Sequence, residues 1–273
     1  FDPSNLFGHL AATAVPGVEE WRDGAYRRTL ALPHGPAIVA LAPRRDHVAA
    51  TVWLADPRDL TPAIGRCRRL LDLDADPVAV ADSLGADPAL AQLIATAPGR
   101  RVPRTTDGAE LALRAVLGQQ VSTAAARTQT ARLVQRLGET VHDPVGGLTH
   151  LFPTVQAVAG LNPDQLPGPR RRAATLIGLA RALASGELEL GPGADRHEAR
   201  RGLGALPGIG PWTVEVVAMR SLGDPDAFPS SDLGIVRAAE HLGLTALDTA
   251  ADRWRPWRSY ATQYLWATLD HPI

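Results

Sequence analysis

The segment Leu206-Pro-Gly-Ile-Gly-Pro-Trp-Thr213 decides the fold of this chain. Its two glycines stand on either side of one aliphatic residue, which allows a tight backbone turn, and Pro211 suits the first position of a following helix. Helical spacing of apolar residues predicts one helix over residues 196–203 and a second over residues 212–222. The amide groups of such a turn, at the positive end of a helix dipole, are suited to binding a phosphate oxygen. The alternative is an ordinary glycine- and proline-rich loop between two helices.

Three further sequence segments support a specific interpretation of this turn. Phe228-Pro-Ser-Ser-Asp232 follows the second predicted helix, Arg253-Trp-Arg-Pro-Trp-Arg-Ser-Tyr260 precedes Leu265-Trp266, and Arg114-Ala-Val-Leu-Gly-Gln-Gln-Val-Ser122 lies upstream. The two helices, their turn and the Asp beyond them resemble the helix-hairpin-helix of the DNA glycosylase superfamily. With the other two blocks in this order, the chain resembles the 3-methyladenine DNA glycosylase II family, the AlkA type, from near residue 5 to near residue 268.

The N-terminal part carries a different pattern from the rest of the chain. Short alternating or β-branched runs predict strands over residues 25–32, 37–42 and 47–54, with helices over 5–14 and 60–71. Farther on, the pattern predicts helices over residues 110–137, 171–185 and 251–269. We therefore expect an α+β fold, with a small antiparallel sheet subdomain over residues 1–86 and an all-helical glycosylase region over residues 87–273.

The basic residues of the chain are all arginine. The formal net charge is −1, and the 28 basic residues include no Lys. A DNA-binding protein usually presents a basic surface. Several arginines gather in the half that carries the turn, namely 170–172, 200, 201, 220 and 237. Enzymes that open an abasic site through a Schiff base use a Lys amine, which in related bifunctional glycosylases lies on the helix after the hairpin, so we expect the reaction to stop at base excision.

Asp232 is the predicted catalytic residue. Breaking an N-glycosidic bond builds positive charge on the sugar, which an ionised carboxylate beside it would stabilise. Asp232 stands 20 residues after Trp212, where the family has its catalytic Asp, and it opens a predicted helix whose dipole favours the ionised form. Taken alone, Asp232 would be an ordinary residue of the first helical turn, with Ser230 or Ser231 as the N-cap.

The resemblance also implies a pocket for the flipped base. Trp212 and Trp266 match pocket aromatics of the family, and electron-rich rings attract a cationic base. Val216 and His9 stand at places where relatives carry aromatic residues, so we expect a less aromatic pocket here. We expect the other tryptophans at positions 21, 53 and 254 to pack in the core.

The resemblance places the DNA contacts at the turn and at one glutamine. Gly208, Gly210, Trp212 and Thr213 are the predicted contacts of the hairpin, and Gln120 is the predicted plug for the gap that a flipped base leaves. A plain surface Gln is the alternative. The family also uses hairpin carbonyls to bind Na+ or K+, and these would be Gly204, Leu206 and Ile209. No other cofactor is expected.

The predicted function is a monofunctional DNA glycosylase that excises 3-methyladenine and related alkylated bases in base excision repair. The alternatives are a glycosylase for an oxidised or bulky-alkylated base, and a non-catalytic helix-hairpin-helix protein that only binds DNA. We expect a cytoplasmic, nucleoid-associated monomer that binds damaged double-stranded DNA and no membrane. Cys67 is the only cysteine, which excludes an internal disulfide and a four-Cys iron–sulfur cluster. Because the first residue is Phe1, we expect a trimmed chain or part of a longer polypeptide.

Overall fold

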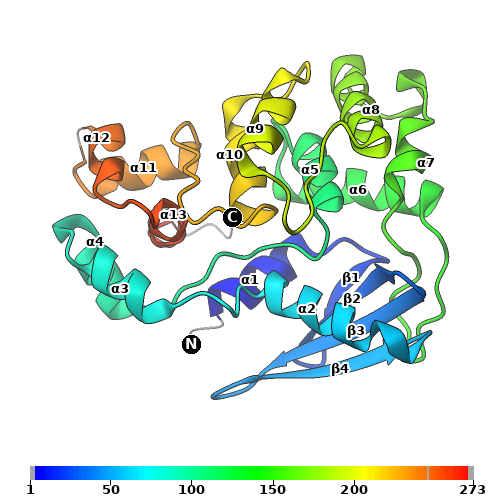
Figure 1. Ribbon diagram of the computed structural model, residues 1–273, viewed down its shortest axis with the longest axis horizontal. Coiled ribbons are helices and arrows are strands. Elements are labelled where there is room, and N and C mark those ends of the chain that lie inside the picture. The colour runs from blue at the N-terminus through cyan, green and yellow to red at the C-terminus, as the bar shows by residue number, and fades with distance from the viewer. Residues whose placement is uncertain (1–3, 245, 270–273) are drawn as a thin grey trace.

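The computed structural model describes residues 4–244 and 246–269, and its N-terminal part is built on a four-stranded antiparallel sheet. The strands are β1 Glu19–Arg22, β2 Ala25–Leu32, β3 Gly35–Pro43 and β4 Val48–Leu54, paired in chain order (Figure 1). The register places Tyr26 opposite Leu41 and Ile38 opposite Trp53. Strands β2 to β4 confirm the prediction. Strand β1 lies outside it, because Glu-Glu-Trp-Arg carries no apolar alternation.

Two helices flank this sheet, α1 Ser4–Thr13 and, after the short 3-10 helix η1 Pro57–Asp59, α2 Leu60–Leu70 (Figure 1). Both were expected from the apolar spacing. Helix α2 buries Ala63, Cys67 and Leu70, which lie on one face because they are four and three residues apart. They pack in one apolar cluster with Tyr26 and Leu41 of the sheet. This cluster is the core of the N-terminal part.

Helices α3 Pro77–Gly85 and α4 Pro88–Thr96 come next and lie outside the prediction. Each begins with an Asp N-cap followed by a Pro at the first helical position. The side chain of Asp76 accepts from the amide of Val78, and that of Asp87 accepts from the amide of Ala89. The repeated Asp-Pro pair was the readable signal. Helix α4 packs against the C-terminal helix α13 Arg258–Trp266 (Figure 1).

The single helix predicted over residues 110–137 is wrong. The structure has two helices there, α5 Gly108–Leu117 and α6 Thr123–Leu137. Between them Gln120 has φ +57, a left-handed conformation that ends regular helix, and Ser122 caps α6 by accepting from the amide of Ala125. The break places the Gly118-Gln119-Gln120 segment in a loop.

The remaining helices complete an all-helical region (Figure 1). They are α7 Val155–Ala159, η2 Pro163–Gln165, α8 Arg170–Ser185, α9 Arg196–Ala205, α10 Pro211–Arg220, α11 Leu233–His241, α12 Leu247–Asp252 and α13. The helix predicted over 251–269 is wrong, because Pro256 cannot continue a helix and separates α12 from α13. Helices α8, α9 and α10 confirm the prediction, as does the α+β fold class. In the described part of the chain no helix is long and apolar enough to cross a membrane.

The tryptophans expected in the core differ in how deeply they are buried. Trp254 is fully buried in the helical core and packs edge-on against Phe228. Trp21 is 43% exposed and packs edge-on against Phe7, so its assignment to the core is wrong. Its place on the edge strand β1 explains the exposure.

Candidate functional site

The carboxylate of Asp232 accepts three N–H groups from three different helices. As the N-cap of α11 it accepts from the Ile235 amide at 3.1 Å. Its Oδ2 accepts from the indole Nε1 of Trp212 at 2.8 Å, and its Oδ1 accepts from the indole Nε1 of Trp266 at 2.9 Å. Three donors from different helices hold this carboxylate in one orientation. Asp232 is therefore itself the N-cap, and the alternative with Ser230 or Ser231 in that place is wrong.

Two hollows meet beside this carboxylate. An apolar pocket of about 290 Å³ is lined by Trp212, Val216 and Trp266 among others. An open groove of about 630 Å³ is lined by Asp232, Gln120 and Thr213 among others. Trp212 lines both hollows, and its N–H edge faces Asp232. The carboxylate consequently lies in the groove, and Trp212 stands between it and the pocket.

The pocket wall follows one face of α10. Trp212, Val216 and Arg220 are each four residues apart, so their side chains lie one above another along the helix. All three line the pocket, as does His9 of α1. The structure therefore brings the four predicted pocket residues (Trp212, Trp266, Val216 and His9) to one cavity, and it adds Arg220, which had been counted with the DNA-binding surface.

The two glycines of the hairpin turn differ in backbone conformation, and only Gly208 has a positive φ. Gly208 has φ +88, and a Cβ added there would lie 2.1 Å from Thr175 Oγ1, a hydroxyl that donates to the Pro207 carbonyl at 3.0 Å. Gly210 is the N-cap of α10 with φ −97, and nothing lies within 4 Å of an added Cβ. The backbone conformation therefore requires a glycine at position 208 but not at position 210. Both glycines line the groove.

The loop between α5 and α6 contacts the hairpin directly. Gln119 donates from Nε2 to the Gly208 carbonyl at 3.1 Å and to Thr213 Oγ1 at 3.2 Å, and its own carbonyl accepts from Arg172 at 2.8 Å. The neighbouring Gln120 is exposed at the groove. The structure thus places Gln120, the hairpin glycines and Thr213 on one surface.

The arginines expected to form a basic DNA-binding face divide into groups. Arg171 and Arg172 line the groove. Arg200 instead pairs with Glu215 at 3.0 Å and with Asp224 at 2.6 Å. Arg220 points into the pocket. The basic surface at the groove is consequently smaller than the sequence suggests.

The three carbonyls predicted to hold a monovalent cation lie at the end of α9 and in the turn. Gly204 is in the last turn of α9, Leu206 is its C-cap, and the Leu206 carbonyl accepts from the Ile209 amide at 3.1 Å. The last carbonyls of a helix lack intrahelical partners and carry the negative end of its dipole. Neutral oxygen donors of this kind fit Na+ or K+. Among the described residues, no cluster of three or more His, Cys, Asp and Glu side chains is placed to bind a metal ion.

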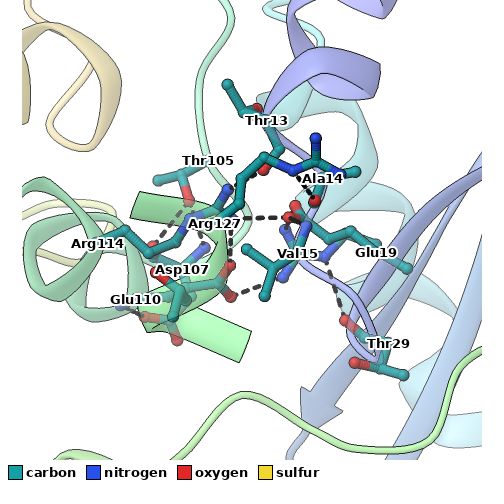
Figure 2. Close-up of polar contacts among 12 residues, drawn as sticks. Thr13, Ala14, Val15, Glu19, Thr29, Thr105, Asp107, Glu110, Arg114 and Arg127 are labelled. Atoms are coloured by element: carbon teal, nitrogen blue, oxygen red, sulfur yellow. Dashed lines mark hydrogen bonds and ion pairs between the residues drawn. The ribbon is translucent and has the colours of Figure 1, made fainter. Parts of the chain in front are cut away.

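An ionic network in the wall of the pocket was missed by the sequence analysis. Arg114 of α5 pairs with Glu19 and Glu110, both at 2.9 Å, and Arg28 pairs with Glu110 at 2.6 Å. Figure 2 shows Arg114 reaching from the helical region to Glu19 and to the Thr13 carbonyl beside it. Burial alone would raise the pKa of Glu19, but the charges of Arg114 and Arg28 lower it to about 2. The network joins the sheet to the helices that carry the site.

His9 and Arg220 form the inner end of the pocket. His9 Nε2 lies 2.6 Å from Arg220 Nη2, and Arg220 Nε donates to the Pro103 carbonyl at 2.7 Å. Burial and the nearby charge of Arg114 lower the pKa of Arg220 to about 10, which still leaves it charged at neutral pH. The sequence could have indicated that Arg220 lines the pocket, because it lies on α10 eight residues after Trp212 and so on the same helix face.

Known proteins match nearly all of this chain. The AlkA N-terminal domain matches residues 1–107, and the HhH-GPD superfamily base excision DNA repair protein matches residues 113–258. A Mycobacterium tuberculosis protein named "Probable bifunctional transcriptional activator/DNA repair enzyme AlkA" is 58% identical over 98% of this chain. The chain spans 55% of that relative's length.

Two further comparisons cover nearly all of both chains. "DNA-3-methyladenine glycosylase 2" of Escherichia coli is 35% identical, and the match covers 98% of this chain and 94% of that protein. The solved structure of a 3-methyladenine DNA glycosylase from Archaeoglobus fulgidus superposes with a TM-score of 0.80 at 22% identity, over 96% of this chain and 94% of that one. The second comparison shows the same fold.

Proposed function

The chain belongs to the HhH-GPD superfamily of base excision DNA repair proteins, and on this premise we propose that it is a DNA glycosylase that excises alkylated bases, 3-methyladenine among them, from double-stranded DNA. The name of the Escherichia coli relative, which the match covers over 94% of its length, supports the substrate class. The observation that carries the proposal is Asp232, a carboxylate that lies in the open groove and is fixed by two indoles that also line the pocket. A protein that only binds DNA needs no such carboxylate.

Asp232 acts on the sugar in this proposal. The base enters the pocket past Trp212 and Trp266, which leaves C1′ of the deoxyribose near the groove side, where the carboxylate lies. The bond from C1′ to the base then breaks, its electron pair leaves with the base, and positive charge develops on the sugar. A carboxylate already held in place stabilises that charge without reorganisation. Water then adds to C1′ and loses a proton to the solvent, which completes the hydrolysis.

The groove holds the DNA. The hairpin amides around Gly208 and Gly210 bind a backbone phosphate, and Arg171 and Arg172 lie in the same groove. Gln120 enters the gap left by the flipped base, where its amide can hydrogen-bond the orphaned partner base. The left-handed backbone of Gln120 and its exposure at the groove support this role.

The reaction ends at an intact abasic site. A Schiff base requires an amine nucleophile, and the chain holds no Lys. Thr213, on the helix where related bifunctional enzymes carry that Lys, is buried, and its hydroxyl accepts from Gln119. When bound, Na+ or K+ at the carbonyls of Gly204, Leu206 and Ile209 would offset phosphate charge beside the hairpin.

A panel of duplexes, each with one modified base, tests the proposal. Purified protein is incubated with duplexes that contain 3-methyladenine, 7-methylguanine, 8-oxoguanine or no lesion, and abasic sites are revealed with alkali. We expect excision of the two methylated bases. Excision of 8-oxoguanine alone would favour the glycosylase for an oxidised base, and DNA binding without any excision would leave only the non-catalytic alternative.

A further inference from the structure

Asp232 stands at the end of a loop without regular secondary structure. The loop joins α10 to α11 over residues 221–232, all of which the structure describes, and we call it the Asp232 loop. Its shape therefore depends on hydrogen bonds to the helices around it. Because a misplacement of about 1 Å at a reacting centre can cost on the order of 10²-fold in rate, the residues that fix this loop bear on the chemistry of Asp232.

Glu215 of α10 fixes the backbone of this loop four residues before Asp232. Its Oε2 accepts from the Phe228 amide at 2.9 Å. Glu215 lies three residues after Trp212, whose indole donates to Asp232 itself, so one helix contacts both the carboxylate and the loop that carries it. Glu215 lines neither the apolar pocket nor the groove. Its route to the reaction is through the loop rather than through the substrate.

Arg200 of α9 sets the orientation of the Glu215 carboxylate. Its Nε and Nη2 donate to the two oxygens of Glu215 at 3.2 and 3.0 Å, a bidentate pair with defined geometry. Its Nη1 donates to Asp224 of the loop at 2.6 Å. Burial alone would raise the pKa of Asp224, but the Asp226 amide and Arg200 lower it, so this carboxyl is ionised at neutral pH. Arg200 thereby joins Glu215 to the first half of the loop.

The first half of the loop has a second anchor on α13. The hydroxyl of Ser259, which is fully buried, donates to two loop carbonyls at 2.7 and 2.9 Å. Beyond Phe228 the backbone turns on itself, and the Asp232 amide donates to the Pro229 carbonyl at 2.8 Å. The bond from the Phe228 amide to Glu215 therefore sets where this final turn begins.

We propose that Glu215, oriented by Arg200, is a positioning residue for Asp232. Its carboxylate oxygen fixes the backbone at Phe228, and the turn that follows carries the Asp232 carboxylate to its place beside C1′ of the sugar. The inference rests on the proposed glycosylase function. The alternative is an ion pair with Arg200 that only joins α9 to α10. Under the proposal the Phe228 amide needs an acceptor of the right reach, whereas the ion pair needs a negative charge.

Two substitutions separate reach from charge at position 215. Glu215→Gln keeps the length of the side chain and an oxygen that can accept from the Phe228 amide, but it removes the charge. Glu215→Asp keeps the charge and shortens the side chain by one methylene, about 1.5 Å, which takes the oxygen out of hydrogen-bond range. Glu198→Asp makes the same change at an exposed glutamate of α9 outside both hollows and is the matched control.

Single-turnover excision of 7-methylguanine is measured over a range of protein concentrations, which gives the maximal rate and the half-saturating concentration separately. The temperature is one at which thermal unfolding shows every variant to be folded. Glu215→Asp should lower the maximal rate by about ten- to a hundredfold and leave the half-saturating concentration unchanged, because Asp232 acts after the DNA is bound. Glu215→Gln and Glu198→Asp should retain most of the maximal rate.

The order of the two variants at position 215 decides the outcome. Slow excision by Glu215→Gln, whatever the rate of Glu215→Asp, overturns the inference, because an acceptor of the right reach would then not suffice. Wild-type maximal rates in both variants overturn it as well. A loss confined to the half-saturating concentration does the same, since it would place Glu215 in DNA binding. In each of these cases the wild type still excises 7-methylguanine and the proposed function stands, whereas a wild type that excises no base removes both.

Discussion

Replacing Gly208 by alanine should destabilise the protein through the hairpin turn. At φ +88 an alanine costs about 1–2 kcal/mol relative to glycine. Its Cβ would also lie 2.1 Å from Thr175 Oγ1, so Thr175 must move and give up its hydrogen bond to the Pro207 carbonyl. That bond contributes about 0.5–1.5 kcal/mol. We therefore expect the free energy of unfolding to fall by about 2–3 kcal/mol.

Gly210→Ala is the matched control, because Gly210 has an ordinary φ and open space around an added Cβ. We expect its free energy of unfolding to stay within about 0.5 kcal/mol of the wild type. Urea denaturation followed by circular dichroism measures both variants. Equal denaturation midpoints for Gly208→Ala and Gly210→Ala would refute the reasoning from backbone strain. Gly210→Asp tests the role of the hairpin in DNA binding without backbone strain. Its carboxylate should repel phosphate and weaken binding to undamaged DNA of any sequence.

Three further predictions concern the ionic network, the abasic product and the carboxylate's partners. Glu19→Gln leaves Arg28 and Arg114 short of a counter-charge and should cost about 3–5 kcal/mol at neutral pH. Because the pKa of Glu19 is lowered from 4.5 to about 2, its stabilisation is present above pH 4.5 and is lost as the pH falls toward 2, so urea denaturation should show the variant and the wild type converging over that window. Borohydride treatment of protein on damaged DNA should trap no covalent adduct, since the chain has no Lys; a strong adduct would instead point to the N-terminal amine. Trp266→Phe removes the indole donor to Asp232, and the single-turnover excision rate should fall by roughly ten- to a hundredfold with DNA affinity unchanged; an unchanged rate would show that this hydrogen bond does not matter.

The sequence predicted the elements whose signals are local. Strand β2 and helices α8 to α10 follow from apolar spacing and from the Gly-Ile-Gly turn, because their patterns are complete within each segment. The break between α5 and α6 escaped prediction, because the residue that adopts the left-handed conformation is Gln120 rather than a glycine. Gly118, two residues earlier, was the one local signal of a helix end. The boundary near residue 86 stays a prediction.

The candidate site was also predicted only in part, because some of its residues belong to local sequence motifs and others meet only in the folded chain. The pocket tryptophans, Asp232 and the hairpin came from motifs read as a family resemblance. The hydrogen bonds from Trp212 and Trp266 to Asp232 join residues 20 and 34 positions apart, which no local pattern reveals. The charge of Arg220 looked like part of a DNA-binding surface, because net charge along the sequence does not tell which arginines become buried.

The measurement that tests the central claim most directly is the single-turnover rate of Asp232→Asn on a duplex with one 7-methylguanine. Asparagine keeps the N-cap of α11, so the fold and the DNA affinity, the latter within a few-fold, should survive. Asp76→Asn, at an exposed N-cap of α3 that lines neither the pocket nor the groove, is the control. We expect excision by Asp232→Asn to slow by at least ~10²-fold while the control remains unchanged. Excision by Asp232→Asn at the wild-type rate would contradict the account.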